Sequence, residues 1–385
     1  MIIIEKKEQC NGCHACSNIC PVQCIEMKED SEGFRYPEVD YKKCIKCNKC
    51  IDVCPLLKEK KDIFKEPKAY ACLNKNEKIR MESSSGGIFT LLAEKILDDN
   101  GVVFGAAFTK ELRLEHKYIE KKEDLNELRG SKYLQSEIGD TLKQVLEFLK
   151  DGRKVLFSGT PCQIGGLKSF LDKKISKEKI KDLLCVDFIC HGVPSLKVFK
   201  KYLKYQEKKS NSKTERIVFR LKNKGWKLYS VSLLFNNNTE YKQQFKNDLY
   251  MRAFLTDISL RPACHECGFK SKGRVSDITM ADFWGIQNVK PELDDDKGTS
   301  LILVHSERGK DYYKSISESI LSKKVDVNEA LKYNSSAVKS VKPHKNRENY
   351  FRDLEELTFE ELHNKYVKDS LIKIVLKKIK RYLKG

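Results

Sequence analysis

The pattern of hydrophobic and polar positions predicts alternating strands and helices from about residue 69 onward. Short apolar runs bounded by turn residues are typical of buried strands, whereas apolar residues spaced three and four apart are typical of helices. Strands are predicted at 102–108, 154–157 and 183–189, and helices at 140–149, from 161 to about 171 and from 196 to about 205. Strand, helix and strand in this order predict a parallel βαβ unit, with the loops 158–162 and 190–195 at one edge of the sheet.

The later part of the chain shows further patterns. Residues 217–221 and 226–235 alternate like two antiparallel strands joined around 223–225. A strand is predicted at 300–305, with a helix near 310–320. Residues 367–383 place apolar side chains on one helical face and lysines on the other, which predicts a basic amphipathic helix. Such a helix could dock on the protein's own body, on a partner, or peripherally on a membrane.

The first 57 residues carry a repeated cysteine motif and hold nine of the fifteen cysteines. The run Cys10-x2-Cys13-x2-Cys16-x3-Cys20-Pro recurs at residues 44–55, and this is the signature of a ferredoxin with two [4Fe–4S] clusters. In such a fold the fourth cysteine of each run binds the other cluster. The predicted ligand sets are Cys10, Cys13, Cys16 and Cys54 for one cluster, and Cys44, Cys47, Cys50 and Cys20 for the other.

A pair of zinc sites is the alternative for these cysteines. Zinc favours two well-separated cysteine pairs, not three cysteines within seven residues and a distant fourth, so the motif favours iron–sulfur clusters. Cys24 lies outside both repeats and is expected to be a core thiol. The charged stretch 58–67 that follows the second repeat is predicted to be a linker.

Six cysteines remain, and their surroundings divide them into two groups. Cys72 and Cys185 lie in apolar, strand-like runs, which favours buried, inert thiols. The other four lie in loops that are rich in glycine, proline and histidine: Cys162, Cys190, Cys264 and Cys267. Two of these loops fall at the predicted sheet edge, and the last two cysteines have ligand spacing. From spacing alone, a third [4Fe–4S] cluster, a zinc site and a redox-active cysteine all remain open.

Composition and charge restrict the partners. The 385 residues carry a formal net charge of +19, which bound iron–sulfur clusters would lower. The excess of positive charge reflects either a lysine-rich solvated surface or attraction to an acidic partner. No nucleic-acid-binding motif accompanies this charge. No apolar run approaches the roughly twenty residues of a membrane-spanning helix, and the N-terminus has the wrong charge order for a signal peptide. We therefore expect a cytoplasmic protein whose cysteines bind metal and do not form disulfides.

From about residue 70 to about residue 320 the chain resembles the beta subunit of coenzyme F420-reducing hydrogenase and its dehydrogenase relatives. Six blocks in the same order carry the resemblance: Ser83-Ser-Ser-Gly-Gly87, Arg129-Gly-Ser-Lys-Tyr133, Phe157-Ser-Gly-Thr-Pro-Cys-Gln163, Cys190-His-Gly-Val-Pro-Ser195, Cys264-His-Glu-Cys267 and Ser276-Asp-Ile-Thr-Met-Ala-Asp-Phe-Trp-Gly285. The resemblance implies an FAD-binding protein with a nearby [4Fe–4S] cluster. Its ligands would be Cys162, Cys190, Cys264 and Cys267, the same four that spacing brings together.

The resemblance also implies flavin contacts. The serines and glycines before the predicted helix 88–97 suit a phosphate, because a helix N-terminus offers free N–H groups. The residues concerned are Ser84, Ser85, Gly86 and Gly87, with Arg129 and Lys132 toward the pyrophosphate and Gly159 and Thr160 under the isoalloxazine. His191 either donates protons near flavin or substrate, or supports the cluster ligand beside it.

Together these features predict an α+β protein. The predicted divisions are a small ferredoxin-like two-cluster domain (1–57), a linker (58–68), a larger α/β flavin-binding domain with a mixed sheet (69–345), and a helical C-terminal extension (346–385) with its basic helix.

The expected function is that of a soluble FAD and iron–sulfur oxidoreductase that exchanges electrons with an electron-carrier protein or partner redox subunit and with coenzyme F420 or another organic compound. A non-catalytic relay subunit, with a tie to polysaccharide biosynthesis among the possibilities, is the alternative, and an iron–sulfur sensor without flavin is a third class. The substrate, the direction of electron flow, the cluster potentials and the oligomeric state cannot be read from the sequence.

Overall fold

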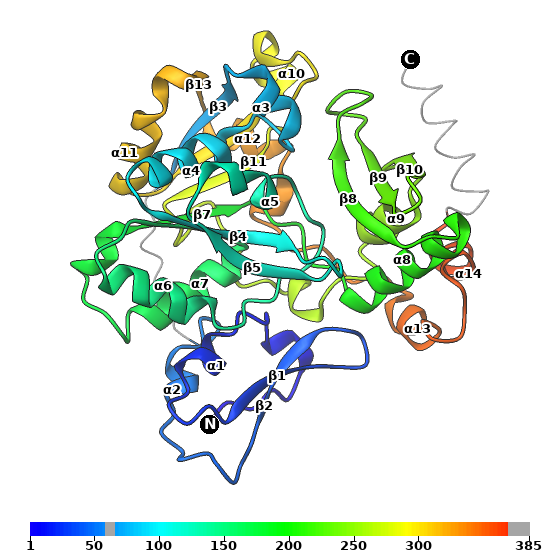
Figure 1. Cartoon of the computed structure of the whole chain (residues 1–385), viewed down its shortest axis with the longest axis horizontal. Helices are drawn as coiled ribbons and strands as arrows, with labels where there is room; N and C mark the ends of the chain where they lie inside the picture. The colour runs from blue at the N-terminus through cyan, green and yellow to red at the C-terminus, as the bar shows by residue number, and fades with distance from the viewer. Residues whose placement is uncertain (58–65, 369–385) are drawn as a thin grey trace.

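The computed structural model describes residues 1–57 and 66–368, which form a small N-terminal domain below a larger body with a side lobe (Figure 1). Most of the predicted linker and nearly all of the predicted basic helix lie outside the described residues. None of the described helices combines the length and hydropathy needed to cross a membrane. The overall class is mixed α and β, as predicted from the sequence.

The N-terminal domain repeats one structural unit, as its sequence repeats one motif. The hairpin of β1 (Ile25–Glu29) and β2 (Arg35–Val39) is antiparallel and lies between two short helices, α1 (Ala15–Ile19) and α2 (Lys49–Asp52). Each helix is preceded by a residue in the left-handed conformation, His14 at φ 61° and Asn48 at φ 59°. These residues turn each cysteine loop sharply into its helix. A 3-10 turn, η1 (Lys7–Gln9), precedes the first loop.

The large domain is built on an eight-stranded mixed sheet in the order β13-β3-β12-β11-β7-β6-β4-β5. The four central strands, β11, β7, β6 and β4, run parallel to one another, and the flanking pairs are antiparallel. The strands are β3 (Lys68–Asn74), β4 (Val102–Phe108), β5 (Leu114–Ile119), β6 (Val155–Ser158), β7 (Leu183–Phe188), β11 (Ile278–Asp282), β12 (Ser300–Val304) and β13 (Ile320–Val325). The carboxyl ends of the parallel strands therefore meet at one edge, where such sheets bind ligands.

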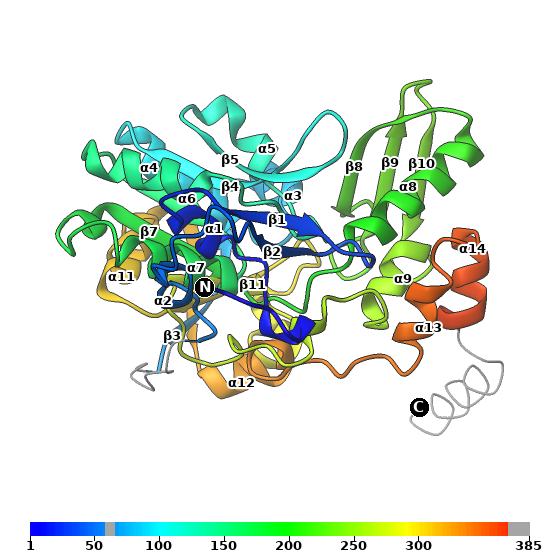
Figure 2. The same ribbon diagram turned by 90° about the horizontal axis from the view of Figure 1, so that it is seen from below.

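Helices cover both faces of this sheet, because its strands alternate their apolar side chains between two cores. Val102 and Phe104 face one core with α6 (Thr141–Lys150) and α7 (Pro161–Leu171), whereas Val103 faces the other with α4 (Ile88–Asp98). The first core also contains residues of the N-terminal domain, which lies below α7 in Figure 1 and in front of the large domain in the view from below (Figure 2). The two domains thus share one hydrophobic core.

The side lobe holds a three-stranded antiparallel sheet, β10-β9-β8, whose strands are β8 (Thr214–Leu221), β9 (Ser230–Phe235) and β10 (Glu240–Gln244). An aromatic-rich core joins this sheet to surrounding helices. These are α8 (Leu196–Ser210), α9 (Leu249–Leu255), α13 (Arg347–Arg352), α14 (Phe359–Leu362) and the π-helical turn His363–Val367. Because residues after 346 contribute to this core, the described part of the C-terminal segment packs on the body of the protein.

The remaining short elements connect these layers. They are α3 (Glu77–Glu82), η2 (Lys122–Asp124), α5 (Leu125–Leu128), η3 (Lys179–Asp182), η4 (Pro262–Cys264), α10 (Ile286–Val289), η5 (Pro291–Leu293), α11 (Glu307–Ser315), η6 (Ser317–Ser319), α12 (Val327–Lys332) and η7 (Ser335–Ala337).

Several elements differ from the prediction in their bounds: the helix predicted from 196 to about 205 extends to Ser210, and the strand predicted from 217 begins at Thr214. The helix predicted near 310–320 lies at Glu307–Ser315, because Ser306 caps its N-terminus and the chain then enters β13 at Ile320. The strand predicted from residue 226 begins only at Ser230. Trp226 is instead fully buried and stacks on Trp284, with ring centroids 4.9 Å apart. This stacking takes the residue out of the strand pairing.

Candidate functional site

The first predicted ligand set lies on the side of the N-terminal domain that faces the large domain. Cys13 lies within electrostatic reach of Cys16, Cys10 and Cys54, and burial followed by these neighbours raises the pKa of its thiol. Burial likewise raises the pKa of Cys16, with Cys10 and Cys54 contributing. The structure therefore brings together the four cysteines that the motif assigns to one cluster.

The second predicted set lines a hollow on the outer side of the same domain. Cys20, Cys44, Cys47 and Cys50 all contribute to its wall. Cys24 lines it as well, with its Sγ 3.5 Å from the Sγ of Cys20. Cys24 is buried as expected for a core thiol, but it lies beside the predicted ligands and not apart from them. Cys47 is exposed to solvent.

The four remaining loop cysteines, Cys162, Cys190, Cys264 and Cys267, line one cavity at the carboxyl edge of the sheet. Cys162 opens α7, where Thr160 caps the helix in a capping box with Gln163 and its hydroxyl lies 3.1 Å from Cys162 Sγ. Cys190 follows β7, Cys264 ends a 3-10 turn, and the backbone N–H of Val193 donates to Cys264 Sγ. Segments far apart in sequence thus place four thiols around one space.

The arrangement of these donors bears on the kind of metal they could bind. Across residues 1–57 and 66–368, no group of three or more His, Cys, Asp or Glu side chains is arranged to bind a single metal ion. Zinc requires four donors about 2.3 Å from one point, whereas a cubane cluster stands between its four thiolates and needs them farther apart. Four thiols around one cavity form the donor set of a [4Fe–4S] cluster.

One turn of α7 connects the first cysteine set to this cavity. Cys162 begins the helix, and Gly166 follows one turn later. A Cβ atom added at Gly166 would lie 2.9 Å from the Cβ and Sγ atoms of Cys13. Asn11, next to the first ligand of the N-terminal set, lines the cavity itself. The absence of a side chain at Gly166 thus permits close approach of the two groups of thiols.

The predicted flavin residues of the two earlier motifs lie side by side. The backbone N–H of Ser131 donates to Ser84 Oγ at 2.6 Å, which fixes the loop 129–132 against the loop 84–87. Arg129 pairs with Glu82 at 2.6 Å and also donates to Thr90. The structure therefore joins these motifs into one surface, although the Arg129 guanidinium already has a carboxylate partner.

Lys132 is half-buried, and among the described residues its ammonium group has only backbone carbonyls as partners. Its Nζ donates to the carbonyls of residues 128, 129 and 130 at 3.1, 3.0 and 3.3 Å. Burial lowers the pKa of its ammonium group to about 7. A half-buried ammonium that has no carboxylate partner among the described residues is a favourable neighbour for an anionic ligand, because the ligand would supply the missing negative charge.

Gly86 and Gly87 have a packing role. A Cβ atom at Gly86 would lie 2.5 Å from the carbonyl oxygen of Cys72, and the Gly86 N–H already donates to Ser300 Oγ. Gly87 adopts φ 81°, in the left-handed region that favours glycine. Ser85 donates to the carbonyl of Thr299. These contacts hold the start of α4 against the sheet, so the Gly86 N–H is not free for a phosphate.

Gly159 and Thr160 lie at the carboxyl end of β6, immediately before Cys162. The Gly159 N–H donates to the carbonyl of Val186, and the Thr160 N–H donates to Gln163 Oε1. Nearby, the buried ring of His116 contacts Ser136 Oγ and the Ser158 carbonyl, and burial lowers its pKa to about 4. The predicted isoalloxazine contacts therefore adjoin the cysteine cavity.

His191 lines the cysteine cavity beside Cys190, and both of its ring nitrogens have partners. Nε2 lies 2.6 Å from Asp257 Oδ1, and Nδ1 lies 3.3 Å from Ser336 Oγ. An imidazole held at both ends is well placed to orient the neighbouring ligand loop. The geometry favours this supporting role over proton donation.

Sequence reasoning missed a buried cluster centred on Arg220. Its guanidinium pairs with both oxygens of Asp282, donates to the Ser84 carbonyl and lies 4.0 Å from the ring centroid of Tyr229. Nε is buried without a hydrogen-bond partner among the described residues. Asp282 lies within the motif block 276–285, which was the one signal in the sequence, whereas Arg220 lies in an ordinary alternating strand.

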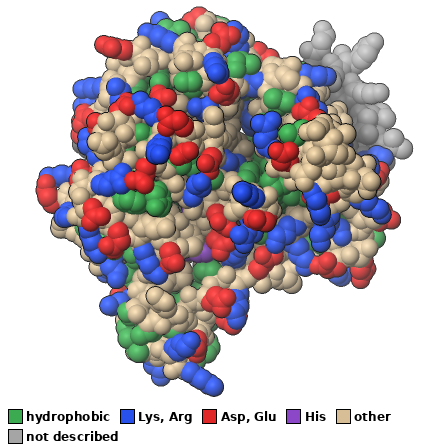
Figure 3. Space-filling view, viewed as in Figure 1, with side chains coloured by type: hydrophobic (Ala, Val, Ile, Leu, Met, Phe, Trp, Pro, Cys, Tyr) green, Lys and Arg blue, Asp and Glu red, His purple; other side chains and the backbone are tan. Residues whose placement is uncertain are grey.

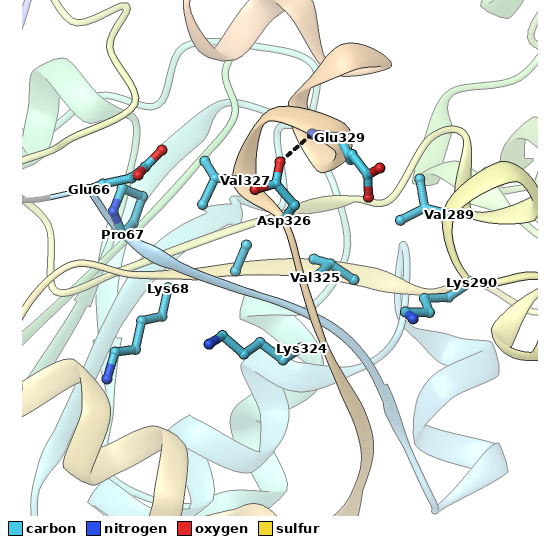
Figure 4. A pocket seen from close by; sticks show the side chains of 11 residues that line it. Glu66, Pro67, Lys68, Val289, Lys290, Lys324, Val325, Asp326, Val327 and Glu329 are labelled. Carbon is cyan, nitrogen blue, oxygen red and sulfur yellow. Dashed lines mark hydrogen bonds between the residues drawn. The ribbon is translucent and has the colours of Figure 1, made fainter.

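A separate surface hollow is lined mainly by residues from β3, β13 and α12 (Figure 4). Lys68, Lys324, Asp326 and Glu329 contribute charged side chains to it, and Asp326 Oδ1 accepts the Glu329 N–H. None of the predicted site residues lines this hollow. We therefore assign the candidate site to the cysteine cavity and its neighbours.

Family profiles match most of the chain. The profile of the coenzyme F420 hydrogenase/dehydrogenase beta subunit matches in two parts, its N-terminal region at residues 69–143 and its C-terminal region at residues 152–329. A 4Fe-4S dicluster domain matches at residues 9–56.

Individual relatives cover different parts of the chain. An uncharacterized protein of Methanocaldococcus jannaschii is 25% identical over 351 residues, covering 80% of this chain and 86% of its own length. One of the subunits of the F(420)H(2) dehydrogenase of Methanosarcina mazei is 21% identical over 51% of this chain and 58% of its own length. A chain of the F420-reducing [NiFe] hydrogenase complex from Methanosarcina barkeri aligns with a TM-score of 0.49 and 16% identity, covering 72% of this chain and 93% of that one.

Proposed function

Because the chain belongs to the family of coenzyme F420 hydrogenase/dehydrogenase beta subunits, we propose that it is an iron–sulfur flavoprotein with three [4Fe–4S] clusters and FAD. The family and the dicluster domain make the chain an iron–sulfur oxidoreductase subunit of this type. The finer proposal rests on one observation, the convergence of Cys162, Cys190, Cys264 and Cys267 on a single cavity.

The layout of thiols supports a path for electrons. The second cysteine set lies toward solvent, the first set faces α7, and the third lies one helical turn beyond. Clusters transfer single electrons, and FAD, when bound, would exchange them for a two-electron hydride with an organic compound such as coenzyme F420. The chain's own residues would hold each centre at fixed positions along this path.

Three features support the FAD part of the proposal. Among the described residues, Lys132 offers a half-buried ammonium without a carboxylate partner, and Arg220 offers a buried Nε without an acceptor. Lys132 follows Ser131, which bonds to Ser84, and Arg220 donates to the Ser84 carbonyl. Gly159 and Thr160 would place the flavin ring near the third cluster. In this arrangement Lys132 would hold a phosphate, while His191 would orient the cluster loop through Asp257.

Iron content tests the third cluster. Replacing Cys264 with Ala should reduce iron from about twelve to about eight atoms per chain, because a cubane contains four. Cys185→Ala is the matched control, since Cys185 is fully buried but lies in a strand and does not line the cavity. An unchanged iron count in Cys264→Ala protein would refute the assignment.

The flavin content of the protein tests its binding of FAD, and its turnover of coenzyme F420 tests whether it is an enzyme. Anaerobically purified protein should release about one FAD per chain, and the chemically reduced protein should bleach oxidised coenzyme F420. Bleaching by the isolated chain supports an enzyme. Reduced clusters and flavin without bleaching would support the second candidate, a relay subunit, which is favoured by the naming of its Methanosarcina mazei relative as a subunit. Absence of flavin would refute the FAD proposal and favour a sensor.

A further inference from the structure

The second cysteine loop combines exposed apolar side chains, exposed lysines and an exposed predicted ligand. Tyr41 is 65% exposed and Ile45 is 61% exposed, although both are large hydrophobic residues. Lys42, Lys43, Lys46 and Lys49 are all exposed, and residues 41–49 contain no acidic residue. Within the described residues, only Lys43 of these four forms an ion pair, with Asp40 at 3.6 Å.

From this surface we propose that residues 41–49 form the docking site for an acidic electron-carrier protein. The proposal rests on the proposed function, because it requires a cluster in the second cysteine set. In Figure 3 the lower lobe, which is the N-terminal domain, carries hydrophobic side chains on its side, and basic side chains with some acidic ones toward its tip. Exposed apolar side chains ringed by charge are typical of protein interaction sites.

The burial of the cysteines points to the same surface for electron exchange. Cys13 packs against Gly166 of α7 and Cys16 is buried in the core shared with the large domain, so the first set is less exposed than the second. Cys47 is the one exposed cysteine among the fifteen, all of which lie in the described residues. A cluster bound there would come close to the surface. Electrons would thus pass between the carrier and the outer set, and onward through the inner set to the cavity.

Charge reversal tests this docking site. The loop variant is K42E/K46E/K49E, and the control is K208E/K224E/K246E, which makes the same charge change at exposed lysines of the side lobe. Reduction of the clusters by a pre-reduced, strongly acidic plant-type [2Fe–2S] ferredoxin would be followed by stopped flow at low and high salt. The loop variant should lose about tenfold or more of the second-order rate constant at low salt, together with its salt dependence. The control should retain both.

A small donor separates docking from cluster assembly. Reduction by methyl viologen radical cation should not slow in the loop variant, which should also keep its iron. Equal losses in both variants, or no loss in either, would overturn the docking site while leaving the clusters in place. Binding of the wild type, but not the loop variant, to phosphatidylglycerol vesicles without any ferredoxin effect would overturn it in favour of a membrane surface. Protein without iron in the second set would refute the proposed function as well.

A second inference comes from a different observation, a buried amide without a partner. Asn11 is only 8% exposed and lines the cavity of Cys162, Cys190, Cys264 and Cys267. Its Nδ2 has no hydrogen-bond acceptor among the described residues. Its backbone carbonyl accepts from Gln135 Nε2 at 2.7 Å, which holds the residue in place. A buried donor without an acceptor is costly because it has given up its hydrogen bond to water, so a partner is expected in the loaded protein.

We infer that Asn11 donates this N–H to a sulfur atom of the third cluster and raises its reduction potential. This inference also rests on the proposed function. The cluster gains negative charge on reduction, so a fixed N–H donor stabilises the reduced form more than the oxidised form. Asn11 is therefore a positioning residue of the N-terminal domain that acts on a centre of the large domain.

Potentiometric titration followed by electron paramagnetic resonance tests Asn11. The third-cluster signal is first identified as the one that Cys264→Ala removes. In Asn11→Leu protein, the ratio of reduced to oxidised third cluster at a fixed potential should fall about tenfold, which for a one-electron couple corresponds to about 59 mV. Asn11→Ser, which keeps a donor, should recover part of the shift. Iron content should be unchanged in both.

Two outcomes distinguish the role of Asn11 from the existence of the third cluster. A third-cluster signal with the same midpoint potential in wild-type and Asn11→Leu protein would overturn the role of Asn11 alone. A signal and an iron count that Cys264→Ala leaves unchanged would refute the third cluster itself, and the role of Asn11 with it.

Discussion

Arg261 should decide how firmly the N-terminal domain is held on the large domain. Its guanidinium is 1% exposed and crosses the boundary between the domains. Nε donates to the Cys10 carbonyl at 2.7 Å and Nη2 to the Arg35 carbonyl at 2.8 Å, while Nη1 contacts Gln135 Oε1 at 3.2 Å. The group also lies 4.4 Å from the ring centroid of Tyr36.

The expected cost of Arg261→Met follows from these contacts. Two partly buried carbonyls would lose their donor, at about 1–2 kcal/mol each, and the loss of the cation–π contact adds about 0.5–2 kcal/mol. Methionine keeps most of the apolar stem, and removal of a buried charge without a carboxylate partner offsets part of the loss. We expect the docking of the domains to weaken by about 2–5 kcal/mol.

Pulse proteolysis in urea, followed by cluster absorbance, measures this change. Arg153→Met serves as the control, because Arg153 also donates to a carbonyl, that of Asn100, but is partly exposed and lies within the large domain. It should cost less than about 1 kcal/mol, as expected for a surface substitution. Arg261→Lys, which keeps the charge without the fork of donors, should fall between. An Arg261→Met protein within about 1 kcal/mol of wild type would refute the reasoning.

Three further predictions concern single residues. Gly166→Ala should destabilise the domain contact by about 1–3 kcal/mol in urea unfolding and should slow electron transfer to the third cluster. The reason is that the Cβ of the new alanine would lie 2.9 Å from Cys13. An unchanged rate of electron transfer would contradict the close approach. His116→Gln should flatten the pH dependence of stability between about pH 6.5 and 4. The wild-type histidine is neutral in the fold with a pKa of about 4 and protonates more readily when unfolded, so wild-type stability is lost as the pH falls. Parallel curves of stability against pH for the two proteins would count against this prediction. Cys24→Ala should keep about twelve iron atoms per chain, since Cys20 supplies the fourth ligand, and a loss of about four would make Cys24 a ligand.

The central strands could be predicted because both the alternating apolar pattern and the turn residues pointed to the same elements. Residues 102–108 form β4 with the predicted bounds, and the segments predicted at 154–157 and 183–189 form β6 and β7 within one residue at each end. The parallel pairing of β6 with β7 places the loops 158–162 and 190–195 together, as the βαβ rule requires. Local sequence was sufficient here because the connections are short.

The convergence of Cys264 and Cys267 on the same cavity could only be inferred from ligand spacing and family resemblance. More than seventy residues separate Cys190 from Cys264, and they include the whole three-stranded sheet. The roles of Arg261 and Asn11 were not predictable at all. Each depends on contacts with another domain, and neither residue stands in a pattern that distinguishes it from an ordinary loop residue.

The position of β3 has a consequence for how the chain is made. This strand is the first of the large domain, yet both of its neighbours, β12 and β13, come from residues 300–325, near the end of the described chain. During synthesis, more than two hundred residues must therefore follow Ala69, Ala71 and Leu73 before their core can form. The N-terminal domain, whose hairpin is local, has all its own cysteines in place long before then. The cysteines of both ferredoxin sets are thus synthesised well before the late pairing of β3 completes the sheet of the large domain.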